Sequence, residues 1–125
     1  MALERKKILL VDDSSLVLRV EQLILSKGPY ELITARDGQE GIERALADPP
    51  DLVLMDLVMP RMDGLEAVRR LRANEATRLI PVIMVTTLGE ADSMEAGFAS
   101  GCSDYVTKPI EATLLLAKVR DHLGL

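Results

Sequence analysis

Five polar residues stand at the ends of segments that have the character of strands. They are Asp12, Asp13, Asp56, Thr86 and Lys108. Three carboxylates gathered in one place repel one another, and each is hard to keep ionised unless a cation joins them. A hard divalent cation such as Mg²⁺ prefers oxygen ligands and leaves positions for water and a phosphoryl oxygen. An amine and a hydroxyl suit the other phosphoryl oxygens, so the set predicts Asp56 as a nucleophile that forms an aspartyl phosphate.

The strand that ends in Asp56 is the centre of this prediction. Residues 51–60 open with a short apolar run that is partly β-branched, too brief for a helix and bounded by prolines. The five predicted strands cover residues 8–11, 30–35, 51–56, 81–85 and 104–107. Helical spacing of apolar residues predicts helices around 14–27, 41–46, 65–71, 90–100 and 111–123. The segment 30–35 is half alternating, which favours a place near the sheet edge.

Strands that alternate with helices through short loops predict an α/β fold, a doubly wound five-stranded parallel sheet with helices on both faces. The carboxyl ends of the strands meet at one edge of such a sheet, where ligands bind. A chain of 125 residues is large enough for one domain with its own core. A single acid at a strand end could be only a turn residue, but the five matching residue types favour one shared site.

Composition excludes several classes of function. A net charge of -5 disfavours direct binding of nucleic acid, whose partners are usually basic. No apolar run approaches the length of a membrane span, and the segment after Lys7 is too short for a signal peptide. The single cysteine, Cys102, suits a reducing compartment and a small buried position. We therefore expect a cytoplasmic protein with no membrane partner.

Several motifs resemble the receiver domain of bacterial two-component response regulators, and the resemblance covers nearly the whole chain. The motifs are Ile8-Leu9-Leu10-Val11-Asp12-Asp13, Val53-Leu54-Met55-Asp56, Met59-Pro60, Met62-Asp63-Gly64, Pro81-Val82-Ile83-Met84-Val85-Thr86 and Asp104-Tyr105-Val106-Thr107-Lys108-Pro109. The resemblance, nearest to single-domain chemotaxis receivers, implies a flavodoxin-like (βα)5 fold with strand order 2-1-3-4-5. It also implies one receiver domain over residues 1–125.

The same resemblance implies a phosphoacceptor switch rather than an enzyme. Asp56 would take a phosphoryl group from a sensor histidine kinase or a phosphotransfer protein, in a reaction that needs Mg²⁺, which Mn²⁺ could replace. Asp13, Asp56 and the backbone carbonyl of Val58 would ligate the metal, and Asp12 would act through water. The domain would then lose the phosphoryl group slowly by its own chemistry.

The remaining family roles concern Lys108, Thr86 and Tyr105. The resemblance implies that Lys108 pairs with the phosphoryl group and that the Lys108–Pro109 peptide bond is cis. Thr86 would move toward the phosphoryl group, and the ring of Tyr105 would follow into the vacated space. A half-buried aromatic at a strand end, with no switch role, is the competing interpretation of Tyr105.

Two apolar positions differ from well-known chemotaxis receivers. Val58 lies two residues beyond the acceptor and Leu88 two beyond Thr86. Those relatives carry polar groups at the two places, which help to position attacking water. We therefore predict that the phosphorylated form of this chain is longer lived than in fast-cycling relatives.

One surface feature suggests a contact outside the site. Leu114-Leu115-Leu116 spreads large apolar side chains over about 200° of a helix, so some must be exposed. The family resemblance makes the last helix and strand an output face, which would meet a downstream protein or a second copy, unless neighbouring loops cover it. Arginines around 61–78, including Arg69, Arg70 and Arg72, and the lone His122 are expected to be solvated.

Two other functions compete with the switch. An aspartate-nucleophile phosphohydrolase usually places its nucleophile after the first strand, with a second acid two residues on, whereas Val58 occupies that place here. Steady turnover of phosphate esters would favour it. A receiver-like adaptor that is never phosphorylated is disfavoured by the complete acid, threonine and lysine set. No glycine-rich loop follows Val11, which disfavours nucleotide binding.

Overall fold

A computed structural model describes residues 5–87, 99 and 101–125 of the chain. The five strands are β1 (Lys6–Val11), β2 (Tyr30–Ala35), β3 (Leu52–Asp56), β4 (Val82–Thr87) and β5 (Asp104–Lys108). The helices in the described part are α1 (Ser15–Leu25), α2 (Gly38–Ala47), α3 (Gly64–Ala73) and α5 (Ala112–Leu123). The helix predicted at 90–100, apart from residue 99, and the residue Leu88 fall outside the described residues. None of the described helices is long and apolar enough to cross a membrane.

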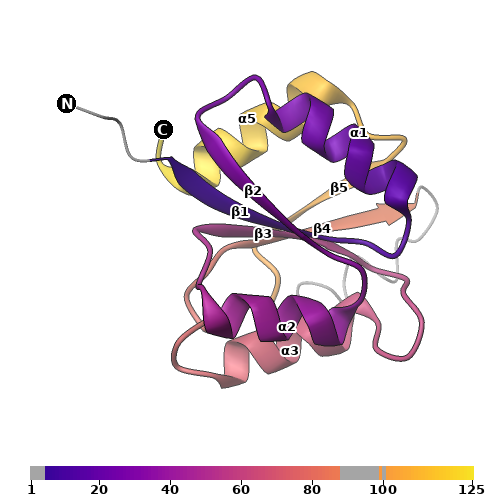
Figure 1. The fold of residues 1–125 in the computed structure, drawn as a ribbon, viewed down its shortest axis with the longest axis vertical. Coiled ribbons are helices and arrows are strands. Elements are labelled where there is room, and N and C mark those ends of the chain that lie inside the picture. Colours follow the sequence, from indigo (N-terminus) through magenta and orange to yellow (C-terminus); the bar gives the residue numbers. More distant parts are fainter. Residues whose placement is uncertain (1–4, 88–98, 100) are drawn as a thin grey trace.

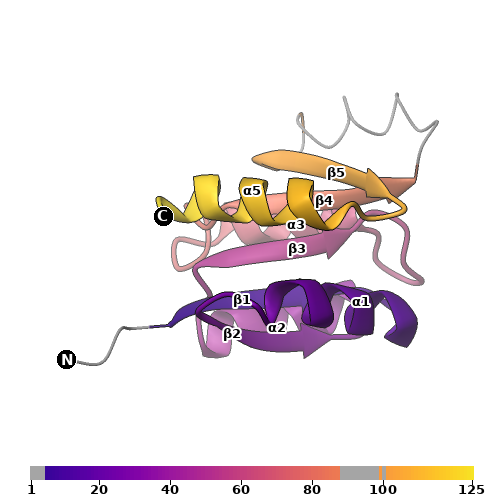
Figure 2. The same ribbon diagram turned by 90° about the horizontal axis from the view of Figure 1, so that it is seen from above.

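The strands form one parallel sheet in the order β2-β1-β3-β4-β5. Figure 2 shows this order across the molecule, with β2 at one edge, as its alternating sequence predicted. Helices α1 and α5 cover one face of the sheet, and α2 and α3 cover the other (Figure 1). The predicted doubly wound, flavodoxin-like fold is thus confirmed.

The sheet separates two apolar cores, and β3 contributes to both. All five residues of β3 are buried, which explains its continuous apolar sequence. Val53 and Met55 pack in the core under α2 and α3. Leu52 and Leu54 pack in the core under α1 and α5. Because side chains alternate along a strand, Asp56 continues the row of Leu52 and Leu54.

Helix α1 buries a different face from the one that its leucines suggest. Leu16 and Leu23 are 72% and 65% exposed. The residues that pack inward are Leu18, Glu21 and Leu25. The helix was predicted correctly from its spacing, but an acid in the middle of the buried stripe concealed which side faces the core.

Helix α5 supports the prediction of exposed apolar surface. Leu114 is 46% exposed, whereas Leu115 and Val119 are fully buried. Leu116 is partly buried and packs against the core. Leu115 and Val119 therefore lead the inward face, with Leu116 and Leu123 packed beside them, and Leu114 is left at the surface.

Candidate functional site

Three carboxylates converge at the carboxyl ends of β1 and β3. Asp12, Asp13 and Asp56 each offer an oxygen atom, and these atoms all lie within 4.8 Å of one another. Asp12 and Asp56 are 1% and 5% exposed, whereas Asp13 is exposed. The sheet register explains the first pair, since Val11 is paired with Met55 and the next residues along the two strands are the acids.

The orientation of Asp12 is fixed by the turn that follows β1. Its Oδ1 atom accepts a hydrogen bond from the backbone N–H of Ser14 at 2.8 Å. Ser14 in turn caps α1, because its hydroxyl accepts from the N–H of Val17 at 3.3 Å. The start of α1 is thereby tied to the acidic cluster.

Lys108 reaches the acids from β5. Its Nζ atom lies 3.2 Å from Asp56 Oδ1 and 3.6 Å from Asp12 Oδ2. The Lys108–Pro109 peptide bond is cis, as predicted. Burial alone would lower the pKa of Lys108, but attraction to Asp56 and Asp12 outweighs it and the pKa is raised. The amine therefore remains a cation at neutral pH.

The single positive charge of Lys108 does not neutralise the three carboxylates. Burial, followed by the charge of Asp12, raises the pKa of Asp56 to about 6 against the pull of Lys108. Burial also raises the pKa of Asp12. The Oδ2 atom of Asp12 is buried and lacks a hydrogen-bond partner among the described residues. An all-oxygen donor set with excess negative charge fits a hard divalent cation such as Mg²⁺.

The loop after Asp56 packs closely on the end of β3. The backbone N–H of Leu57 donates to the carbonyl of Val85 at 3.1 Å, and the N–H of Gly64 donates to the carbonyl of Leu57 at 2.8 Å. A side chain at Gly64 would collide with the backbone carbonyl of Asp56. Glycine is thus required where α3 begins. Val58, between these contacts, has a side chain that is 65% exposed.

Thr86 lies near the end of β4. It is one residue beyond Val85, which pairs with Asp56, and its own partner in β5 is Thr107. Its side chain is 3% exposed. Sequence reasoning placed Thr86 at this edge of the sheet, and the strand register puts it between the strands that carry Asp56 and Lys108.

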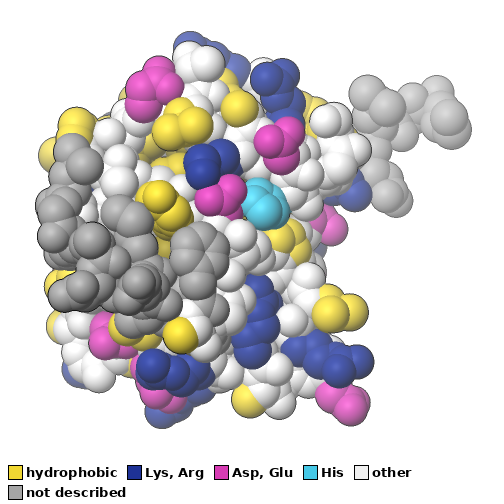
Figure 3. All heavy atoms as spheres, turned by 180° about the vertical axis from the view of Figure 1, so that it is seen from behind, with side chains coloured by type: hydrophobic (Ala, Val, Ile, Leu, Met, Phe, Trp, Pro, Cys, Tyr) yellow, Lys and Arg dark blue, Asp and Glu magenta, His cyan; other side chains and the backbone are white. Residues whose placement is uncertain are grey.

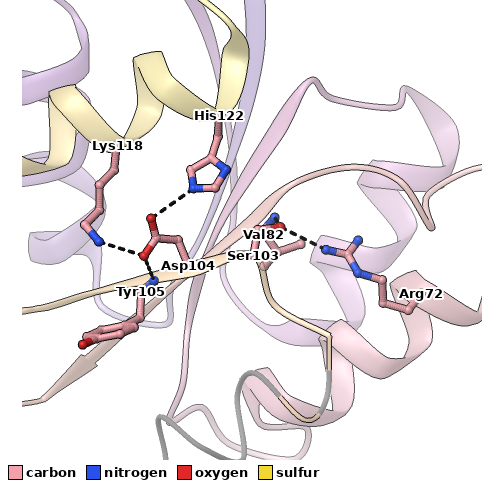
Figure 4. Close-up of polar contacts among 7 residues, drawn as sticks. All are labelled: Arg72, Val82, Ser103, Asp104, Tyr105, Lys118 and His122. Atoms are coloured by element: carbon pink, nitrogen blue, oxygen red, sulfur yellow. Dashed lines mark hydrogen bonds and ion pairs between the residues drawn. The ribbon is translucent and has the colours of Figure 1, made fainter.

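Tyr105 lies in β5 under a side chain of α5. The Nζ atom of Lys118 is 5.4 Å from the centre of the Tyr105 ring, within the range of a cation–π contact. Figure 4 shows both side chains beside Asp104, whose Oδ1 atom also accepts from the backbone N–H of Tyr105 at 2.8 Å. Tyr105 is only partly buried, so its ring stands near the surface of the predicted output face.

Asp104 joins β5 to α5. Its carboxylate accepts from Lys118 Nζ at 2.7 Å and lies 3.0 Å from His122 Nε2 (Figure 4). Burial alone would raise the pKa of Asp104, but the hydrogen bonds with Lys118 and His122 lower it. On the face seen in Figure 3, the histidine lies among acidic and basic side chains with hydrophobic ones nearby. His122 was expected to be simply solvated, and that expectation was wrong because Asp104 holds its ring.

Arg72 also departs from the prediction of a solvated arginine face. Its guanidinium donates to the carbonyls of Gly101 at 2.8 Å and Ile80 at 2.6 Å, and it reaches the hydroxyl of Ser103 at 3.4 Å. Figure 4 shows Arg72 directed toward Ser103, whose hydroxyl also accepts from the N–H of Val82. Arg72 therefore fastens α3 to the start of β5, whereas Arg70 pairs with Glu66 at the surface.

Glu21 is the ionisable residue that sequence reasoning missed. It is 1% exposed and lies on the inward face of α1. Burial and then the charge of Asp12 raise its pKa to about 8. Its spacing from Leu18 and Leu25 was the available signal, since the three residues share one face of a helix.

Comparisons of the chain with a family model and with individual proteins agree with one another. The family model of the response regulator receiver domain matches residues 8–120. Response regulator PleD of Caulobacter vibrioides is 42% identical over 115 residues, which are 91% of this chain and 25% of PleD. Protein PilH of Pseudomonas aeruginosa is 37% identical over 118 residues, which are 94% of this chain and 98% of PilH.

A solved structure with the same fold is the receiver domain of sensor histidine kinase PA1611 from Pseudomonas aeruginosa PAO1, with a magnesium ion coordinated in its active site cleft. It has a TM-score of 0.90 and 29% sequence identity, and the match covers 98% of this chain and 100% of that one. The chain spans between a quarter and about half of the length of the first curated relatives that it matches.

Proposed function

The chain belongs to the response regulator receiver domain family, and on that premise we propose that it is a phosphoacceptor switch whose acceptor is Asp56. The observation that carries the proposal is the cluster itself, with three carboxylates within 4.8 Å and Lys108 3.2 Å from Asp56. Nothing in a structural core requires this cluster, because like charges that are buried together destabilise a fold unless something binds them.

In the proposed reaction, an oxygen of Asp56 attacks the phosphorus of a phosphohistidine on a sensor histidine kinase or phosphotransfer protein. A P–O bond forms, the P–N bond breaks, and its electron pair returns to the imidazole nitrogen, which takes up a proton. Asp56 must be ionised to attack, and its pKa of about 6 leaves it largely so at neutral pH. Lys108 is placed to hold an oxygen of the incoming group.

We propose that Asp13, Asp56 and the backbone carbonyl of Val58 hold a magnesium ion, with Asp12 acting through water. Such an ion supplies charge that stabilises the phosphoryl oxygens during transfer. The donor chemistry of the cluster supports this assignment, as does the magnesium ion in the PA1611 receiver. Mn²⁺, which also accepts oxygen ligands, is expected to replace Mg²⁺.

The proposed response begins at Thr86 and ends at the face of β5 and α5. Thr86 would turn toward the phosphoryl group, and the ring of Tyr105 would follow it inward. A few new charge-assisted hydrogen bonds suffice to bias two packings that differ by a few kcal/mol. The partial burial of Tyr105 and the exposed Leu114 support this face as the contact for a downstream protein or a second copy.

We further propose that residues 1–125 act as one receiver domain. We also propose a cytoplasmic location. The single cysteine, Cys102, is free, which suits a reducing compartment.

Intact mass spectrometry after incubation with acetyl phosphate and Mg²⁺ tests the proposal. The wild type is expected to gain one phosphoryl group, and Asp56→Asn is expected to gain none. Asp51→Asn, a change in an exposed acid before β3, serves as the matched control and should be modified like the wild type. Equal modification of Asp56→Asn and wild type would refute the assignment, and steady release of phosphate without retained label would favour the phosphohydrolase.

A further inference from the structure

Glu21 is a buried acid for which the proposed phosphoryl transfer has no use. It lies between Leu18 and Leu25 on the face of α1 that packs against the sheet, with 1% of its surface exposed. A carboxyl group enclosed in this way destabilises the fold relative to a leucine at the same place. Packing alone therefore gives no reason for an acid at this position.

The surroundings of Glu21 point to the acidic site. The charges that act on it are those of Asp12, Lys108 and Asp56, in that order, and they come from β1, β5 and β3. These strands direct Asp12 and Asp56 to the same side as the core under α1 and α5. Burial and then Asp12 raise the pKa of Glu21 to about 8, so the carboxyl retains its proton at neutral pH.

Two buried oxygen atoms lack hydrogen-bond partners among the described residues, and they are Glu21 Oε1 and Asp12 Oδ2. The nearest cation to Asp12 Oδ2, Lys108 Nζ, is 3.6 Å away, which is too long for a hydrogen bond. A protonated carboxyl is a donor, and Asp12 Oδ2 is an acceptor that has room for one. Buried water commonly satisfies two such groups at once.

We propose that Glu21 is a positioning residue for Asp12, and that one buried water links the unpartnered oxygen of Glu21 to Oδ2 of Asp12 by hydrogen bonds. These bonds would hold the Asp12 carboxylate toward the metal site from the interior side. The inference rests on the proposed function, because that function gives Asp12 its place beside the magnesium ion. It adds a residue of α1 to a site otherwise built at the ends of strands.

Mg²⁺ affinity, measured by isothermal titration calorimetry at pH 7 without a phosphodonor, tests the inference. Glu21→Gln keeps the shape and an N–H donor, whereas Glu21→Leu removes both polar atoms. We expect Glu21→Gln to stay within about twofold of wild type and Glu21→Leu to bind about tenfold more weakly, as when a group that orients a metal ligand is lost. Leu18→Met, on the same face of α1, is the control for altered packing and should bind as wild type does.

The possible outcomes distinguish a failure of the Glu21 inference from a failure of the proposed function. Equal affinity in wild type and Glu21→Leu would overturn the inference and leave the proposed function standing. A loss in Glu21→Gln as large as that in Glu21→Leu would also overturn it, because the amide keeps a donor. A wild type that binds no Mg²⁺ would instead count against the proposed function, and the wild-type titration alone reveals this.

Two further measurements do not depend on metal binding. Carbon-13 NMR of the metal-free wild type should find the Glu21 carboxyl protonated at pH 7, and an ionised carboxylate there would overturn the inference. In urea, Glu21→Leu should unfold at a higher concentration than wild type, because it removes a buried polar group. Higher stability together with weaker Mg²⁺ binding identifies positioning, since a structural role would move both in the same direction.

Discussion

The amine of Lys108 lies 3.2 Å from Oδ1 of Asp56, although the two residues are 52 positions apart in the chain. Their strands are not neighbours either, because β4 lies between β3 and β5. The contact is therefore made across the carboxyl edge of the sheet, over the end of the intervening strand. It couples the charge of the proposed acceptor to the strand that carries Tyr105.

Replacement of Lys108 by methionine tests this contact. The pKa of Asp56 is about 6, mainly because of burial, and Lys108 holds it from rising further. We expect that pKa to rise in Lys108→Met and the rate of modification by acetyl phosphate to fall about 100-fold, the usual effect of losing one oxyanion donor. NMR titration and mass spectrometry measure the two effects. Lys118→Met, which removes a lysine outside the acidic site, should leave both unchanged.

Asp56→Asn should stabilise the fold in a pH-dependent way. The pKa of Asp56 is raised from 3.8 to about 6. Its favourable contribution to the free energy of unfolding is therefore present below pH 3.8 and lost as the pH rises through 6. At pH 7.5 the folded wild type retains a poorly solvated charge, and the substitution should raise the free energy of unfolding by about 1–3 kcal/mol. Urea unfolding without metal should show almost no difference at pH 3.5. The same gain at both pH values would contradict this origin.

Asp104→Asn should act in the opposite direction. Hydrogen bonds with Lys118 and His122 lower the pKa of Asp104, so its stabilising effect is present above the ordinary value of 3.8 and lost as the pH falls through the lowered one. Because the carboxylate is 24% exposed, we expect a loss of only about 1 kcal/mol at pH 7. Thermal unfolding at pH 7 and pH 2.5 measures it. Asp121→Asn, on α5, provides the matched control.

Val58 should influence how long the phosphoryl group persists. Its apolar side chain is 65% exposed two residues after Asp56, where it offers no hydrogen bond to water. We expect Val58→Asn to shorten the lifetime of the phosphorylated form severalfold, since a polar group there can position water for attack. Decay followed by mass spectrometry after removal of donor gives the rate. Val58→Ala, which is also apolar, should decay as wild type does, and unchanged decay in both would refute the prediction.

The sequence was sufficient to predict the sheet, because a strand buried on both faces has a continuous apolar run that few other elements share. Asp12, Asp13 and Asp56 were correctly expected to lie together, since parallel topology alone brings strand ends to one edge. The N-terminal boundary of β1 was predicted less accurately. It begins at Lys6 rather than at residue 8, because backbone pairing with Tyr30 extends the strand through two lysines.

The hydrophobic pattern of the sequence could not predict the long-range polar contacts. Arg72 is spaced like a solvated residue, and only the three-dimensional proximity of Gly101, Ile80 and Ser103 gives its guanidinium partners. His122 likewise depends on Asp104, 18 residues away in sequence. Glu21 was missed for a related reason, because hydrophobic patterning assigns an acid to the surface, whereas Glu21 is 1% exposed.

The alternation of side chains along β3 makes the length of this strand as important as its composition. Apolar residues can replace one another within it, provided that their volumes are similar. One inserted or deleted residue before Asp56 would reverse the direction of every side chain beyond it and send the acceptor to the opposite layer. Among variants of this chain, β3 should therefore tolerate exchanges of hydrophobic residues and exclude changes in length.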